Sequence, residues 1–445
     1  MPFGDETGAM RGVEGGQSSS GPSAEGTLRA VGALLARLSP RDFTVRLWDG
    51  RTLPPEEGSR SRFTIILTHA ASLRRMVWPP GELTAAEAFI RRDFEVEGDL
   101  VAALRLRDRL KIGPREILAI LPAACDLLAA PAPPPAARER AARLRGDKHS
   151  RSRDVDAVRH HYDLGNDFYA LWLDRRMVYS CAFFPEPETS LDDAQEAKLD
   201  LVCRKLRLAK EERLLDVGCG WGGLVLHAAE RYGVSALGIT LSPRQAELAR
   251  ERVHAAGLAG RVRIEVADYR TLREAPFDKI VSVGMVEHVG VAELPAYFRQ
   301  AARLLRPGGL FLNHGISPLR PRDGSLRSKV LREGGFVQKY VFPDSELPFV
   351  HECAAAAVEV GLELRDVESL REHYALTLRH WLARLEARQG ELERIAGATT
   401  FRIYRLYLAG AAADFERGQN SVFQSLFVRS DAGASGLPLT RTWVE

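Results

Sequence analysis

The 445-residue chain has few cysteines, little net charge and no long apolar run. Its five cysteines are scattered and form no C-x-x-C pair, which argues against a disulfide framework and a zinc site and fits a reducing cytoplasm. The net charge of +3 gives no general case for a nucleic-acid partner. No apolar run approaches the ~20 residues that span a bilayer, and the N-terminus lacks a signal-peptide pattern. We therefore expect a cytoplasmic protein, soluble or at most lying on a membrane.

The length and the changes in composition predict several segments. They are a disordered Gly/Ser/Glu-rich tail (1–26), a small α+β domain (27–130), a Pro-rich and then basic linker (131–153), a large α/β domain (154–430) and a C-terminal tail (431–445).

In the large domain, strand-like and helical segments alternate. The strand candidates are Arg213–Val217, Ser235–Leu241, Arg261–Val266, Lys279–Val283 and Gly309–His314, with a turn at 306–309 entering the last. Such alternation predicts a parallel, doubly wound sheet with its ligand at the carboxyl ends of the strands.

A glycine-rich turn at 214–223 (LLDVGCGWGG) follows the first of these strands and precedes a helical segment. This arrangement lets a cofactor lie against bare backbone, but it also fits the dinucleotide fingerprint G-x-G-x-x-G. The next strand ends in Thr240, with no acidic residue where a nicotinamide enzyme would hold its ribose. The pattern therefore favours an adenosyl cofactor, and a structural turn without a ligand stays the alternative.

Basic residues follow the Pro-rich linker: Arg138, Arg140, Arg143, Arg145, Lys148, Arg151 and Arg153. They form either a solvated helix face or a patch for anionic phospholipid head groups.

Residues 158 to about 428 resemble the cyclopropane fatty acid synthase family, which includes mycolic acid and branched-chain lipid methyltransferases. The resemblance lies in VRHHYDLGNDFY (158–169), YSC (179–181), LDVGCGWG (215–222), TLSPRQ (240–245), DYR (268–270), VGMVEHVG (283–290), RPGG (306–309), HGI (314–316), YVFP (340–343) and REHY (371–374). The N-terminal domain also looks like that of the family, with weaker motifs.

The resemblance implies a class I methyltransferase-type doubly wound α/β sheet preceded by a small α+β domain. It implies transfer of the methyl group of S-adenosyl-L-methionine to the cis double bond of an unsaturated phospholipid acyl chain. The resulting carbocation would lose a proton to bound bicarbonate and close a cyclopropane. The enzyme would act peripherally on the inner face of the membrane, and a homodimer is one assembly open to it.

The resemblance also implies the site residues. The cofactor-binding positions are Tyr179, Ser180, Asp216, Gly218, Gly220, Gly222, Thr240, Gln245, Asp268 and Tyr269. The bicarbonate cradle is Cys181, Glu287, His314, Ile316 and Tyr374, of which all but Ile316 are expected to be catalytic. Plainer readings stay open, with His314 as a core histidine and Tyr374 packed under Trp381. No metal site is expected.

One position departs from the family pattern. Many members carry a cysteine where this chain has Ala411, in a helix that we expect to continue to Gln424. Some relatives that leave a methylene branch also lack this cysteine. A methylene-branched product is therefore one alternative. Methylation of a small soluble metabolite and a non-catalytic lipid-binding role are two further alternatives, which do not depend on this position.

Overall fold

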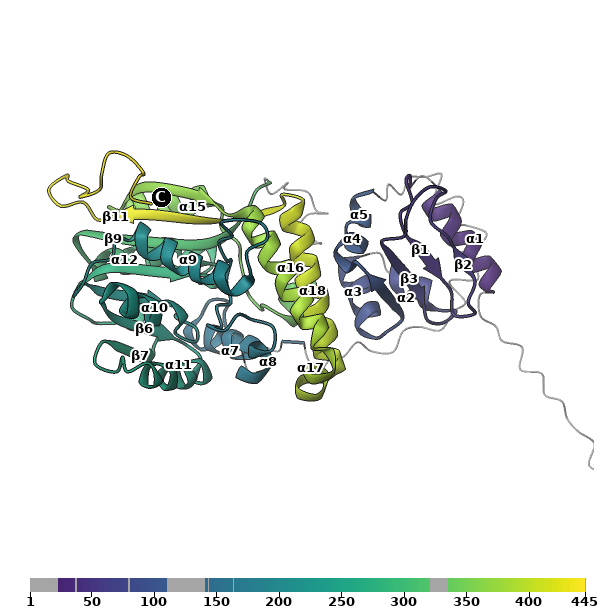
Figure 1. Ribbon diagram of the computed structural model, residues 1–445, viewed down its shortest axis with the longest axis horizontal. Coiled ribbons are helices and arrows are strands. Elements are labelled where there is room, and N and C mark those ends of the chain that lie inside the picture. The colour runs from purple at the N-terminus through teal and green to yellow at the C-terminus, as the bar shows by residue number, and fades with distance from the viewer. Residues whose placement is uncertain are drawn as a thin grey trace, which may run out of the picture.

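The computed structural model describes residues 23–36, 38–78, 81–109, 141–142, 144–162, 164–320 and 335–444, without the side chains of Arg159 and His160. A small α+β domain lies beside a larger α/β domain, and helices α16 and α18 face it (Figure 1). Residues 1–22 of the expected tail lie outside the described residues. The end of that segment is helical, since helix α1 begins at Ala24. The Pro-rich part of the linker also lies outside the described residues.

The small domain is a four-stranded sheet, ordered β2-β1-β3-β4, with short helices. Its elements are α1 (Ala24–Leu35), β1 (Thr44–Arg46), β2 (Thr52–Leu53), β3 (Phe63–Leu67), α2 (Ser72–Val77), α3 (Glu82–Ile90), β4 (Phe94–Gly98), α4 (Leu100–Leu104) and α5 (Leu106–Arg109). Val45 pairs with Leu53 across the hairpin at Asp49-Gly50. The rings of Phe43 and Phe63 stack 4.9 Å apart and anchor the core of the sheet.

The large domain is built on a seven-stranded sheet. Its strands are β5 (Arg213–Val217), β6 (Ser235–Thr240), β7 (Val262–Val266), β8 (Phe277–Val283), β9 (Leu305–Pro318), β10 (Glu363–Ser369) and β11 (Asn420–Val428). Its α-helices are α7 (Arg151–Tyr162), α8 (Asn166–Ala170), α9 (Leu191–Lys205), α10 (Gly223–Tyr232), α11 (Pro243–Ala255), α12 (Leu294–Leu304), α14 (Phe336–Tyr340), α15 (Val350–Glu359), α16 (Arg371–Ala387), α17 (Gln389–Ala396) and α18 (Ala398–Glu416). Three short 3-10 turns are η2 (Tyr269–Thr271), η3 (Val286–His288) and η4 (Val291–Glu293).

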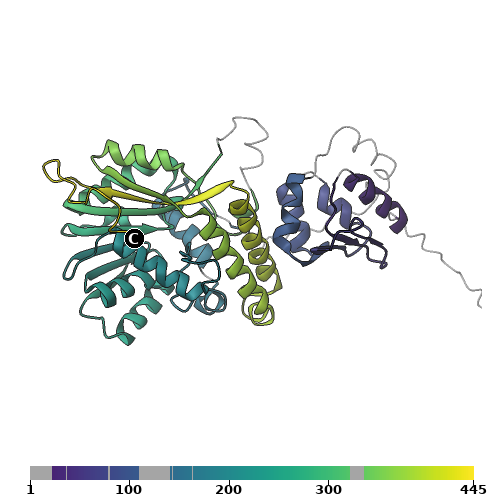
Figure 2. The ribbon, with the colours of Figure 1, turned by 45° about the horizontal axis from the view of Figure 1, so that its top comes forward.

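The sheet order is β10-β11-β9-β8-β5-β6-β7, and β11 runs in the direction opposite to that of the other six strands. Helices cover both faces (Figure 2). This is the doubly wound fold of class I methyltransferases, as the sequence predicts. β5 pairs with β6 on one side and with β8 on the other, so the chain switches direction at the carboxyl end of β5. Ligands bind at such a switch point in open α/β sheets.

Three sequence expectations differ from the structure. The turn expected at 306–309 is a bulge inside β9, because Leu305 and Leu310 pair with Phe277 and Lys279. Gln424 lies on strand β11 and not on the C-terminal helix, which ends at Glu416. The last residues of the expected linker belong to helix α7, which begins at Arg151.

The two domains are joined by polar contacts on α14 and α18. The buried guanidinium of Arg402 donates to the Phe89 carbonyl at 2.8 Å and to both carboxylate oxygens of Glu95 at 2.8 Å. Lys339 and Tyr340 both donate to Glu87, at 2.7 and 3.0 Å. Within the described part of the chain, none of the helices is both long enough and apolar enough to cross a membrane.

Candidate active site

A cavity opens at the carboxyl ends of β5, β6 and β8, where the fold predicts a ligand. Gly218 and Gly220 form its floor, and both have positive φ, of 87° and 54°. A Cβ built on Gly220, or on Gly284 across the cavity, meets no atom within 4 Å. The glycines thus leave open space that a ligand can fill against bare backbone.

Most of the expected cofactor-binding residues line this cavity: Tyr179, Ser180, Asp216, Gly218, Gly220, Thr240, Gln245, Asp268 and Tyr269. Gly222 does not. It precedes α10 with a φ of 81°, and a Cβ there would approach the Cβ of Ala249 to 3.2 Å. The absence of a side chain at Gly222 therefore lets α10 pack closely against α11. Gly222 is not proposed as a cofactor ligand.

Neutral side chains stand where a nicotinamide enzyme would place a carboxylate. Thr240 Oγ1 donates to Gln245 Oε1 at 2.8 Å, and the backbone N–H of Ser242 donates to Thr240 Oγ1 at 3.1 Å. These bonds fix the turn between β6 and α11 at the edge of the cavity. The turn therefore places neutral hydrogen-bonding groups at the edge of the cavity.

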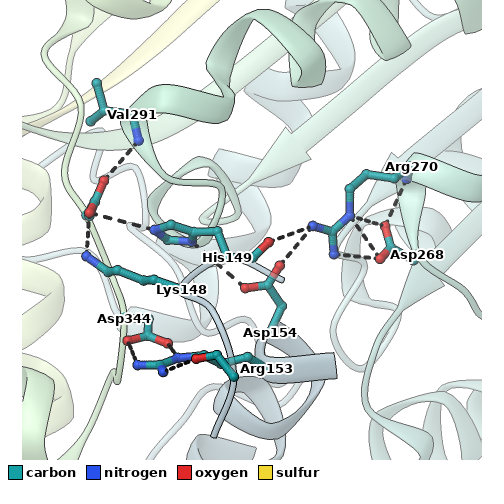
Figure 3. A network of polar contacts seen from close by, with 10 residues as sticks. Lys148, His149, Arg153, Asp154, Asp268, Arg270, Val291 and Asp344 are labelled. Atoms are coloured by element: carbon teal, nitrogen blue, oxygen red, sulfur yellow. Dashed lines mark hydrogen bonds and ion pairs between the residues drawn. The ribbon is translucent and has the colours of Figure 1, made fainter. Parts of the chain in front are cut away.

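Arg270 joins two carboxylates at the cavity wall (Figure 3). Its guanidinium holds Asp268 through Nε and Nη2, at 3.0 and 2.7 Å, and Asp154 of α7 through Nη1 at 3.0 Å. Asp154 and Asp268 both line the cavity. Helix α7 is thereby tied across the cofactor cavity, and Asp268 is oriented before any ligand arrives.

The described part of the basic run is partly used inside the protein. Arg153 Nη2 donates to Asp344 at 2.9 Å, and Lys148 forms an ion pair with Glu346 (Figure 3). Arg145 and Arg151 are exposed. Arg138, Arg140 and Arg143 lie outside the described residues. Arg153 and Lys148 therefore hold the 344–346 segment in place, and Lys148 is exposed as well.

Glu287, on η3, and His314, on the adjoining strand β9, are both buried, and neither lines the cavity. Glu287 Oε1 accepts the backbone N–H of Ile316 at 2.7 Å, whereas Oε2 is buried without a hydrogen-bond partner among the described residues. Burial raises the pKa of Glu287 to about 7. Burial also holds the pKa of His314 well below its ordinary value, so the imidazole is neutral.

Gln424 fixes the proton of His314. It faces His314 across β9 and β11, and its Nε2 lies 3.2 Å from His314 Nδ1. With the amide in this orientation, Nδ1 accepts, so the proton of the neutral ring is on Nε2. Nε2 is buried and has no partner among the described residues. His314 therefore presents a free donor a short distance along the same strand from Ile316.

Cys181 and Tyr374 complete the expected cradle. The Cys181 thiol contacts the carbonyls of Ala182 and Leu370, at 3.2 and 3.8 Å, and burial raises its pKa. Because the thiol stays protonated and contacts two backbone carbonyls, it does not act as an acid or a base. Only the backbone of Cys181 is therefore a candidate to bind bicarbonate. Tyr374 is buried 6.0 Å from Trp381, measured between ring centroids, and burial together with the negative charge of Glu287 raises the pKa of its hydroxyl. It therefore both packs and faces the cradle.

An aromatic wall, formed by Tyr162, Tyr179, Trp172 and Trp381, borders the cavity on the side of Glu287. Tyr162 and Tyr179 line the cavity, and the Tyr162 hydroxyl interacts electrostatically with Glu287 behind it. Tyr179 packs against Trp172 and Trp381, with ring centroids 5.3 and 5.2 Å away. These rings make this side of the cavity aromatic.

The family model for mycolic acid cyclopropane synthetase matches residues 149–425. The chain belongs to this family. It is 41% identical over 416 residues to a probable fatty acid methyltransferase of Pseudomonas putida, covering 92% of this chain and 99% of that protein. It is 38% identical over 269 residues to the cyclopropane-fatty-acyl-phospholipid synthase of Escherichia coli K12, covering 60% of this chain and 66% of that enzyme.

A solved mycolic acid cyclopropane synthase in complex with SAH and CTAB superposes on the large domain. It has a TM-score of 0.58 and 36% identity, and the match covers 61% of this chain and 97% of that one. The protein is an S-adenosylmethionine-dependent methyltransferase of the cyclopropane synthase kind.

Sequence reasoning gives no role in the site to two residues, Gln424 and Lys198. Gln424 could be matched to the family, but its partner His314 becomes visible only when β9 and β11 pair. Lys198 of α9 lines the cavity although its side chain is almost wholly buried. A lysine within a run of helical residues carries no signal of this kind, since most such lysines face solvent.

Proposed function

We propose that this methyltransferase transfers a methyl group to the cis double bond of an unsaturated phospholipid acyl chain and forms a cyclopropane. The observation that supports this most directly is the pair of unpartnered buried atoms, Glu287 Oε2 and His314 Nε2, behind an aromatic wall. Buried polar atoms without partners are costly, and they suit a site that a charged species completes.

The cradle fits a bicarbonate ion. His314 Nε2 can donate to an anion and Glu287 Oε2, when ionised, can accept from its O–H, while Tyr374 offers a buried hydroxyl. The backbone N–H of Ile316 is held by Glu287, so Ile316 serves the cradle by orienting that carboxylate. Bound bicarbonate would supply a base that accepts one proton, and S-adenosylmethionine supplies an electrophilic methyl group.

The residues of this chain would perform three tasks. The ionised Glu287 carboxylate would stabilise positive charge that develops on the acyl chain, and its effect is large because the surroundings are dry. Tyr179 and its aromatic neighbours would keep water from the cation. His314, fixed by Gln424, would hold the base through Nε2–H. None of these tasks needs a thiol at Ala411.

The lipid surface is part of the same proposal. Arg145 and Arg151 are exposed and would attract anionic head groups together with the residues between 138 and 143. Binding to anionic vesicles should then fall steeply with salt, because exposed charges are screened beyond ~8 Å at physiological ionic strength. Charge reversal of Arg140, Arg143 and Arg145 should weaken vesicle binding and leave S-adenosylmethionine affinity unchanged. Vesicle binding that does not change with salt would show that the basic residues do not attract the protein to anionic lipid.

The deciding experiment is product analysis by proton NMR. Purified protein is incubated with S-adenosylmethionine and vesicles of dioleoyl phosphatidylglycerol, and the extracted lipid is examined. Upfield cyclopropyl methylene signals are expected. Vinylidene signals would show a methylene-branched product instead. Unchanged lipid from a protein that binds S-adenosylmethionine would overturn the lipid substrate and favour a soluble metabolite or a non-catalytic role.

A further inference from the structure

Lys198 is a buried cation at one end of the cofactor cavity. It lies on α9 with almost no solvent exposure and lines the cavity with Ser180 and Asp216. Its Nζ donates to Ser180 Oγ at 3.0 Å. An ammonium group carries three donors, and among the described residues this hydroxyl is the acceptor that the structure gives it.

The nearby carboxylates do not neutralise Lys198 by direct contact. Asp174 already accepts the backbone N–H groups of Arg176 and Val178, at 2.8 and 2.7 Å. Asp216 interacts with Lys198 only at longer range, and the described residues give Asp216 no ion pair. Lys205, further along α9, shows the contrast: it is equally buried but forms ion pairs with Glu368 and with Asp366, the latter at 3.8 Å.

The cavity therefore holds a separated positive and negative charge, both buried. Leaving such charges unpaired is expensive. A zwitterionic ligand would satisfy both, and the methionyl group of S-adenosylmethionine carries an α-ammonium and an α-carboxylate. Because Ser180 Oγ accepts from Lys198, its own O–H is free to donate into the cavity.

We propose that Lys198, acting through Ser180, positions the α-carboxylate of the cosubstrate, while Asp216 receives its α-ammonium. This inference rests on the proposed function, because it takes the cavity as the site of S-adenosylmethionine. Lys198 is a positioning residue, since the Ser180 hydroxyl makes the contact. The assignment also explains why a lysine is buried here without a carboxylate partner.

The protonation states agree with this arrangement. Burial lowers the pKa of Lys198 to about 8 and raises the pKa of Asp216 to about 7. A bound zwitterion would return both pKa values toward their ordinary range. The other titratable groups that act on Lys198 or feel its charge are Asp174, Cys181, Cys203 and His314.

The test compares two ligands that differ only in the carboxylate. Calorimetry on the full-length protein measures the affinity of S-adenosylmethionine and of decarboxylated S-adenosylmethionine for the wild type, Lys198→Met and Ser180→Ala. Loss of a charge-assisted hydrogen bond should weaken S-adenosylmethionine binding by about 10- to 100-fold in Lys198→Met. The affinity for the decarboxylated ligand should stay unchanged. Ser180→Ala should act in the same direction, and the double variant should lose little more.

Lys205→Met is the matched control, because it removes an equally buried lysine from the same helix outside the cavity. It should bind both ligands like the wild type, and circular dichroism checks the fold of every variant. Equal affinities of Lys198→Met and the wild type for S-adenosylmethionine would overturn the inference. So would a parallel loss for both ligands, because Lys198 would then only shape the cavity. A wild type that binds neither ligand would instead overturn the assignment of the cavity itself.

Discussion

The backbone N–H of Ile316 donates to one oxygen of Glu287 at 2.7 Å, and the other oxygen of that carboxylate is buried without a partner among the described residues. One bond thus fixes the direction of the side chain while half of its accepting capacity stays unused. A purely structural carboxylate would be paired with a cation or fully hydrogen-bonded. The arrangement instead suits a group that meets charge only during the reaction.

Replacement of Glu287 by Gln should lower turnover by about 10²-fold, the usual scale for a positioned electrostatic or acid–base group. The amide keeps the shape and the bond to Ile316 but carries no charge. The affinity for S-adenosylmethionine should change little, because Glu287 does not line the cofactor cavity. Steady-state kinetics and calorimetry measure the two quantities. Wild-type turnover in this variant would refute the electrostatic role.

The same substitution should make the protein more stable above about pH 7. Burial raises the folded-state pKa of Glu287 from 4.5 to about 7, so the unfolded state loses this proton first as the pH rises. Wild-type stability from this group therefore falls between pH 4.5 and about 7. The melting temperature of Glu287→Gln should exceed that of the wild type above this window and approach it near pH 4.5. A constant difference at all pH values would exclude this origin.

Gln424→Met should slow the reaction by about tenfold or more through loss of one buried hydrogen bond. Without the amide donor, the proton of His314 is free to move to Nδ1, which points away from the cradle. Methionine nearly preserves the volume between β9 and β11. Turnover is measured beside S-adenosylmethionine affinity, which should persist. A variant with full turnover would show that the tautomer of His314 does not matter.

Two neighbouring glycines should fail in different ways. Gly220→Val places a branched side chain in the open cavity at a φ of 54° and should abolish S-adenosylmethionine binding while circular dichroism shows a folded protein. Gly222→Ala presses against Ala249 and should mainly lower the melting temperature. Calorimetry and thermal unfolding separate the two effects. If Gly220→Val binds S-adenosylmethionine as tightly as the wild type, the cofactor does not lie against this turn.

Ala411→Cys should leave turnover and product unchanged. Ala411 packs with the apolar core that contains Tyr374, and no covalent step in the proposed reaction needs a thiol. The variant is assayed with the same vesicles and NMR readout as the wild type. A large gain in rate, or a product that differs from that of the wild type, would show that the thiol matters.

Much of the fold follows from the sequence, and its failures have physical causes. Strand β5 forms over the predicted residues. It is buried on both faces, so its sequence is a short apolar run that can be recognised. β10 escapes prediction because an edge strand needs few apolar residues, and its exposed positions include Glu363 and Arg365. β11 directly follows the long helix α18, so its apolar run reads as a continuation of that helix.

The candidate site shows the same division. Glu287 and His314 could be named from local motifs, since each lies in a short segment that resembles the family. The bond from Gln424 to His314 joins residues 110 positions apart and exists only because β11 returns beside β9. The burial of Lys198 depends on how α9 packs on the sheet. A single sequence does not predict which distant strands pair or how a helix is oriented on the sheet.

The ion pair between Lys339 and Glu87 has a consequence for engineering. Glu87 belongs to the small domain, and a few residues beyond Lys339 the backbone N–H of Glu346 donates to the carbonyl of Glu287 at 2.9 Å. A short stretch of chain therefore connects the domain boundary to the backbone of Glu287. The small domain is consequently not an exchangeable module. Transferred to another protein it would lose its contact with Lys339, and the large domain left behind would lose the ion pair that holds the segment bonded to Glu287.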